Sequence, residues 1–186
     1  LTIISIAIGQ GEVTATPLQM ANLGATIANR GYFITPHVVK EVEDEALDSL
    51  YTTKRYTKVR EEHYETVVQG MRAAVTGGTC RAANLPGLDV CGKTGTAQNR
   101  GKDHSAFMGF APMNNPKIAV AVYVENGGWG ATYGVPIGAL IMEKYLNGEY
   151  TPVAKGLVYV IVKDTNEKKT ITTDEYYSNK EKYIAG

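Results

Sequence analysis

Eight consecutive residues, Cys91 to Gln98, hold the side chains in this sequence that are best suited to chemistry. They read Cys-Gly-Lys-Thr-Gly-Thr-Ala-Gln, so one cation and two β-hydroxyls lie among small residues that leave the backbone accessible. A lysine ammonium and threonine hydroxyls can hold a carboxylate through charge-assisted hydrogen bonds. A nearby backbone N–H can stabilise an oxyanion that develops during acyl transfer. A phosphate-binding loop is a second interpretation of the same residues.

The phosphate-loop interpretation rests on Gly87–Thr94, which matches the spacing G-x-x-x-x-G-K-[ST] in full. Such a loop needs a strand before its first glycine and a helix that begins at its lysine. Neither flank fits, because Pro86 interrupts the segment before the loop and Gly95 disfavours entry into a helix. A nucleotide-binding module that uses Gly87–Thr94 stays as an alternative, and it requires a helix that starts at Lys93.

The strand interpretation places residues from about Leu88 to Ala97 in one β-strand, with K-T-G-T on an exposed edge of the sheet. Apolar and polar residues alternate in the first half of this segment, which is the period of a strand. Alternate side chains point to opposite faces, so Lys93 should face one side of the strand, and Thr94 and Thr96 the other. A glycine at position 95 lets a ligand or another backbone approach closely.

Helices and further strands are predicted on both sides of this segment. One helix begins after Thr16, with Pro17 at its first position and Gln19 where a capping box needs it, and runs to about Arg30. The other predicted elements are a helix over about 60–75, strands over 104–111 and 118–124, and a helix over about 135–146. Leu1–Ile8 is expected to be a buried extended run, and residues 157–162 a strand. The pattern predicts an α+β fold in which helices cover an antiparallel sheet.

Four blocks along the chain resemble a known family. They are Ile8–Gly11 with Thr14–Met20, then Lys93–Gln98, His104–Pro112 and Val120–Gly128. In this order they resemble the C-terminal half of class B penicillin-binding proteins, most closely the elongation-type enzyme of rod-shaped bacteria, and K-T-G is the third motif of penicillin-recognising serine enzymes. The resemblance covers about Ser5 to Gly148 and implies a partial penicillin-binding transpeptidase fold, similar to that of serine β-lactamases.

The family function that the resemblance implies is peptidoglycan D,D-transpeptidation. An active serine in S-x-x-K attacks the D-alanyl-D-alanine end of a stem peptide, an S-x-N motif assists proton transfer, and β-lactams acylate the same serine. Neither motif occurs in the 186 residues. We therefore expect a C-terminal fragment that contributes one side of the active-site cleft without the nucleophile and that is inactive alone. A β-lactam hydrolase or sensor of the same fold is a further alternative.

The resemblance also implies roles for individual residues. Lys93 and Thr96 would be catalytic, the first through its positive field and the second through a backbone N–H that is one of two oxyanion donors. Thr94, Gly95 and Gln98 would join them in binding the substrate. No metal or cofactor is expected.

Charge and composition limit the partners. The 19 basic and 19 acidic side chains cancel, so no general attraction to nucleic acid is implied. No apolar run is long enough for a membrane span. The resemblance implies an anchor upstream, with the domain at the periplasmic face of the bacterial cytoplasmic membrane. The resemblance implies the stem peptide, β-lactams and cell-wall elongation proteins as partners, and an exposed sheet would favour self-association.

Two segments and several single residues complete the predictions. Residues 1–148 are assigned to the transpeptidase domain, and residues 149–186 to a C-terminal extension of unknown role. Cys80 and Cys91 do not have a zinc-site spacing, and two buried free thiols are favoured over a disulfide. Trp129 is expected to be partly buried by packing, and His104 is a candidate for the rim of the cleft.

Overall fold

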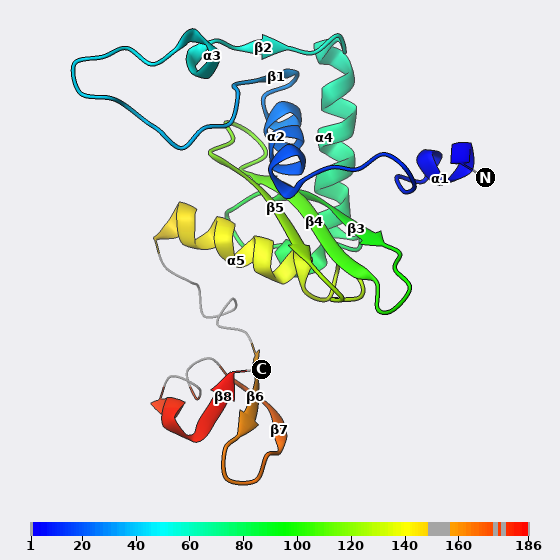
Figure 1. Cartoon of the computed structure of the whole chain (residues 1–186), viewed down its shortest axis with the longest axis vertical. Coiled ribbons are helices and arrows are strands. Elements are labelled where there is room, and N and C mark those ends of the chain that lie inside the picture. The colour runs from blue at the N-terminus through cyan, green and yellow to red at the C-terminus, as the bar shows by residue number, and fades with distance from the viewer. Residues whose placement is uncertain (1, 149–156, 173–174, 176–177, 186) are drawn as a thin grey trace. The chain divides into compact units, whose positions relative to one another are not determined.

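The computed structural model describes residues 2–148, 157–172, 175 and 178–185. The chain divides into two compact units, Leu1–Leu146 and Asn147–Gly186 (Figure 1). No helix in the described part of the chain is both long and apolar enough to cross a membrane.

A three-stranded antiparallel sheet forms the centre of the first unit. Its strands are β3 (Cys91–Ala97), β4 (His104–Ala111) and β5 (Ile118–Val124), in the order β3-β4-β5. All three were predicted, but β3 begins at Cys91 rather than near Leu88, because Asp89 adopts a left-handed φ of 43° in the preceding turn. Within the described residues, β3 and β5 are therefore the edges of this sheet.

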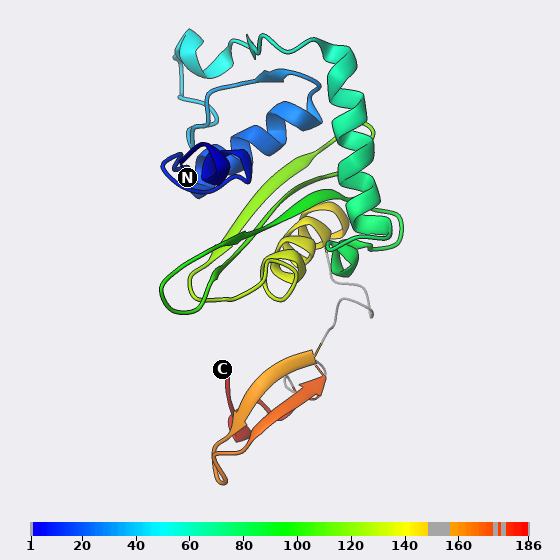
Figure 2. The ribbon, with the colours of Figure 1, turned by 90° about the vertical axis from the view of Figure 1, so that its right-hand side faces the viewer.

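Two helices cover one face of the sheet, α2 (Pro17–Ala28) and α4 (Glu61–Thr76) (Figure 2). The predicted capping box is present at the start of α2, where the Thr16 hydroxyl accepts from the Gln19 N–H and the Gln19 side chain accepts from the Thr16 N–H. The helices and strands share a core formed by Ile27, Ala28, Tyr64, Val68, Met71, Cys91 and Phe110.

Helix α5 (Gly134–Asn147) covers the opposite face of the sheet, around the fully buried ring of Phe107. Glycines of three elements surround this ring. A Cβ added to Gly92, Gly109 or Gly138 would come within 2.6 Å of a Phe107 ring carbon. The aromatic ring therefore occupies the space that side chains at these positions would need, which explains why glycine stands at each of them.

The remaining elements are short. Strand β1 (Tyr32–Phe33) pairs with β2 (Arg55–Tyr56), α3 spans Ser49–Thr52, and the 3-10 turn η1 spans Arg81–Ala83. The second unit is a sheet in the order β7-β6-β8, formed by β7 (Lys168–Thr172), the predicted strand β6 (Leu157–Val162) and β8 (Tyr183–Ala185), with η2 over Lys180–Lys182.

Two expectations were wrong. Leu1–Ile8 is not a buried strand, because residues Thr2–Ala7 form helix α1, and Ile3 and Ile4 are exposed. Periodicity alone cannot separate the two states in so short an apolar run, and hydrogen bonds within the segment, such as Ile8 N–H to the Ile4 carbonyl, form the helix. Trp129 is 74% exposed rather than partly buried, since its loop is anchored through the backbone.

Candidate functional site

Lys93 lies in the middle of edge strand β3, and its side chain is exposed. No helix begins there. Upstream, Gly87 and Asp89 adopt left-handed backbone conformations in a turn that leads into the strand. The phosphate-loop alternative is therefore wrong, because its lysine must stand at the N-terminus of a helix.

The side chains of the K-T-G-T segment alternate between the two faces of the sheet, as the strand period predicted. Lys93 pairs with Met108, which packs against the core under α2 and α4. Thr94 pairs with Phe107, which packs against α5, and Thr96 lies on the same face as Thr94. A ligand that touches the lysine and both threonines must therefore lie along the open edge of β3, between the two faces.

The lysine side chain turns toward this edge. Lys93 Nζ donates to the carbonyl oxygen of Thr94 at 2.7 Å, so the Thr94 backbone points away from β4. Residues two apart in a strand present their N–H and C=O groups to the same side. The backbone N–H of Thr96 therefore also points outward from the sheet, which is the orientation that a hydrogen bond to a ligand at the edge requires.

Helix α4 holds the start of β3 in place. Arg72 donates to the Val90 carbonyl at 3.0 Å and to the Asp89 carboxylate at 3.2 Å. These bonds connect the helix to the two residues immediately before the strand. The position of Lys93 thus depends on an ion pair and a backbone contact that span 17 and 18 positions of sequence.

The loop that follows α4 contacts β3 at Thr94. The hydroxyl oxygens of Thr79 and Thr94 lie 2.8 Å apart, and the Thr79 side chain and the Thr94 backbone both hydrogen-bond the thiol of Cys80. The sequence analysis did not find Thr79. The only available signal was its place after two glycines that end a predicted helix, which indicates a tight corner and not a site.

A glycine from the loop before α5 lies against the same strand. A Cβ on Gly130 would be 2.6 Å from the carbonyl oxygen of Gly95 and 2.5 Å from that of Ala106. On the other face, a Cβ on Gly95 would be 3.4 Å from the Ala106 Cβ. The K-T-G glycine thus lies where backbone from β3, β4 and this loop meets.

The other two site candidates lie near the end of the strand. Gln98 is exposed and follows β3 directly, and its role in substrate binding stays a prediction. His104, at the start of β4, accepts a hydrogen bond at Nδ1 from the Asn126 N–H at 3.0 Å, and its ring lies 5.4 Å from that of Tyr123. These contacts give His104 a structural role in holding the turn after β5.

Both cysteines are free and buried, as predicted. Burial raises the pKa of the Cys91 thiol to about 11. Burial also raises the pKa of the Cys80 thiol, against the opposing effect of its hydrogen bonds and of Lys93. Both thiols are therefore protonated at neutral pH, which makes them poor nucleophiles.

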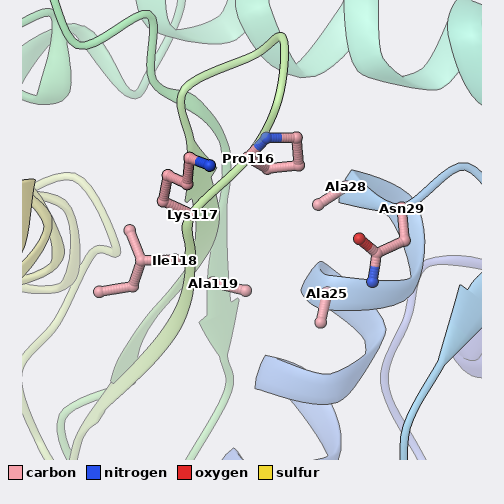
Figure 3. Close-up of a pocket in the computed structure, with 7 residues that line it drawn as sticks. All are labelled: Ala25, Ala28, Asn29, Pro116, Lys117, Ile118 and Ala119. Atoms are coloured by element: carbon pink, nitrogen blue, oxygen red, sulfur yellow. The ribbon is translucent and has the colours of Figure 1, made fainter.

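A cavity of about 140 Å³ lies between the end of α2 and β5 (Figure 3). It is lined by Ala25, Ala28, Asn29, Pro116, Lys117, Ile118 and Ala119. Strand β4 separates β5 from β3, so this cavity is not part of the site around Lys93.

Comparison with known proteins identifies the family. Residues 2–145 match the family model described as the penicillin binding protein transpeptidase domain. The chain belongs to this family. Peptidoglycan D,D-transpeptidase MrdA of Haemophilus influenzae is 33% identical, and the match covers 82% of this chain and 27% of that protein. This chain thus spans about a quarter of the length of this curated relative.

Solved structures show the same fold. Penicillin-binding protein PBP2 of Pseudomonas aeruginosa is 36% identical with a TM-score of 0.67, over 81% of this chain and 34% of that one. The ceftriaxone acyl-enzyme of penicillin-binding protein A from M. tuberculosis is 31% identical with a TM-score of 0.66, over 76% and 35%. PBP2 from Helicobacter pylori, solved with MreC, is 25% identical with a TM-score of 0.64, over 77% and 27%. The predicted partial transpeptidase fold is confirmed.

Proposed function

We propose that this chain is the K-T-G-bearing part of a peptidoglycan D,D-transpeptidase and that β3 binds the D-alanyl-D-alanine end of a stem peptide. The observation that carries the proposal is the exposed edge of β3, where Lys93 Nζ meets the outward-facing backbone of Thr94. An extended peptide can add to such an edge as a further strand, with its carboxylate beside the ammonium. The chain spans 27% of the MrdA relative and contains no S-x-x-K, so the nucleophilic serine is placed outside these residues.

The chemistry assigned to β3 is binding and charge stabilisation. The ammonium of Lys93 and the hydroxyls of Thr94 and Thr96 bind the terminal carboxylate of the donor peptide from the two faces of the strand. As the serine oxygen attacks the penultimate D-alanine carbonyl, the carbonyl oxygen becomes an oxyanion. This oxyanion accepts a hydrogen bond from the Thr96 backbone N–H. The C–N bond then breaks, and the amine of the departing D-alanine takes up the proton that the serine hydroxyl lost. An amine of a neighbouring peptidoglycan strand attacks the acyl-enzyme ester, and its proton returns to the serine oxygen as the ester bond breaks.

The same edge is proposed to bind β-lactams, whose carboxylate takes the place of the peptide's C-terminus. The ceftriaxone acyl-enzyme of the M. tuberculosis relative supports this part of the proposal. The H. pylori structure with MreC supports a cell-wall elongation protein as a partner. Both features fit a domain at the periplasmic face of the cytoplasmic membrane.

The test is covalent labelling of the full-length protein that contains this chain by a fluorescent penicillin. Lys93→Ala removes a charge-assisted hydrogen bond, which is worth roughly 1.5–3 kcal/mol, so the labelling rate should fall about 10- to 150-fold. Lys102→Ala is the matched control, because Lys102 is an exposed lysine in the loop between β3 and β4. The 186-residue chain alone should stay unlabelled.

Two results would contradict the proposal. One is a full-length wild-type protein that the penicillin does not label. The other is a Lys93→Ala protein that is labelled at the wild-type rate.

A further inference from the structure

We propose that Thr79 is a positioning residue for this site: its hydroxyl donates to Thr94 and turns the Thr94 proton toward the substrate carboxylate. The two hydroxyl oxygens lie 2.8 Å apart, and either can be the donor. The inference rests on the proposed function, in which β3 binds a carboxylate.

The corner that carries Thr79 is held rigidly at the end of α4. The N–H groups of Gly78 and Cys80 both donate to the Ala74 carbonyl, at 3.1 and 2.9 Å. A Cβ on Gly78 would lie 2.8 Å from the Ala74 Cα, so the chain can turn this tightly only with glycine. The Cys80 side chain on the other flank is fully buried. Thr79 is therefore exposed at a fixed place between two anchored residues.

The corner is also fastened to β3. The Cys80 thiol is hydrogen-bonded by the Thr94 backbone and by the Thr79 side chain. When a carboxylate accepts the Thr94 proton, the bond between the two hydroxyls can form only with Thr79 as the donor.

The number of protons explains why the direction matters. Each hydroxyl has one proton to donate, and a carboxylate only accepts. If Thr94 donates to Thr79, it has no proton left for the substrate. If Thr79 donates to Thr94, the Thr94 proton is free, and the chain of bonds polarises it toward the anion.

The experiment measures acylation of the full-length protein by benzylpenicillin and by its methyl ester, which lacks the free carboxylate. Thr79→Val should lower the second-order rate constant for the acid about three- to tenfold, the value of one hydrogen bond. The loss should appear in the binding constant, with the limiting acylation rate unchanged. The rate for the ester should not change.

Two further variants separate the hydroxyl from its surroundings. Thr79→Ser keeps the hydroxyl and should restore the wild-type rate for the acid. Thr76→Val is the matched control, because the exposed Thr76 hydroxyl donates within its own helix, to the Ala73 carbonyl. Because Thr79 is exposed, its replacement should not disturb the core. Thr79→Ala also removes the hydroxyl and should behave like Thr79→Val, and a thermal melt of each variant checks that it is folded.

A double mutant completes the test, since two residues that act through one contact are not additive. In a Thr94→Val background, Thr79→Val should have no further effect. The inference is overturned by a wild-type rate in Thr79→Val, by equal losses for acid and ester, or by full additivity with Thr94→Val. If Lys93→Ala abolishes labelling while Thr79→Val stays at the wild-type rate, the positioning role alone is wrong and the proposed function stands.

Discussion

Gly130, in the loop before α5, packs closely against the strand of the candidate site. A Cβ on Gly130 would lie 2.5 Å from the Ala106 carbonyl oxygen and 2.6 Å from that of Gly95. Both oxygens belong to paired strands, since Gly95 and Ala106 are partners in the β3–β4 register. Neither can move without disturbing the hydrogen bonds of the sheet, so Gly130→Ala should strain the sheet.

The loop cannot move away from the sheet without cost, because a buried serine holds it. Ser105 Oγ donates to the Trp129 carbonyl and accepts from the Gly134 N–H, each at 3.0 Å. Overpacking by one methyl group typically costs about 1–3 kcal/mol. Two contacts with backbone atoms point to the upper value, about 3 kcal/mol for Gly130→Ala.

Thermal unfolding of the full-length protein measures the effect. In a domain of 150–250 residues, 1 kcal/mol shifts Tm by about 2–4 °C, so Gly130→Ala should lower Tm by roughly 6–12 °C. It should also slow penicillin labelling, because the displaced strand carries Lys93 and Thr96. Gly101→Ala is the control: no atom lies within 4 Å of its added Cβ, and its stability should stay within about 0.5 kcal/mol of wild type. An unchanged Tm in Gly130→Ala would refute the reasoning.

Two further predictions concern buried groups on β3 and β4. Ser105→Ala leaves the Gly134 N–H and the Trp129 carbonyl without their partner, so denaturant unfolding should show a loss of about 1–3 kcal/mol, and a wild-type midpoint would contradict this role. The raised pKa of Cys91, about 11 against the ordinary 9.0, stabilises the fold below pH 9, and about 2–3 kcal/mol should be lost as the pH rises from 9 to 11. Unfolding free energies at pH 8 and pH 11 test this, and Cys91→Ala should reduce the difference, whereas an equal pH dependence in both proteins would exclude Cys91 as its source.

Local patterns in the sequence were sufficient for the three strands of the first unit's sheet and for the helices that cover it. Residues Cys91–Ala97 of the predicted strand form β3, but the alternation of Leu88–Cys91 that suggested the strand falls mostly in the preceding turn. The Thr16–Gln19 capping box located the start of α2 to the residue. These signals are short-range, since they depend on neighbours within a few positions. They were insufficient for Leu1–Ile8, an apolar run with neither a cap nor a clear period.

The K-T-G-T segment could be selected from the sequence as the candidate site, because the types, order and strand period of its residues are all local properties. The edge position of β3 was predicted and is confirmed in the described sheet. The contact between Thr79 and Thr94 across 15 positions and the approach of Gly130 to Gly95 emerged only in the folded chain. Each depends on which faces of α4, the sheet and the loop before α5 meet. Packing around the buried rings of Phe107 and Phe110 determines which faces meet, and this packing cannot be predicted from any short stretch of sequence.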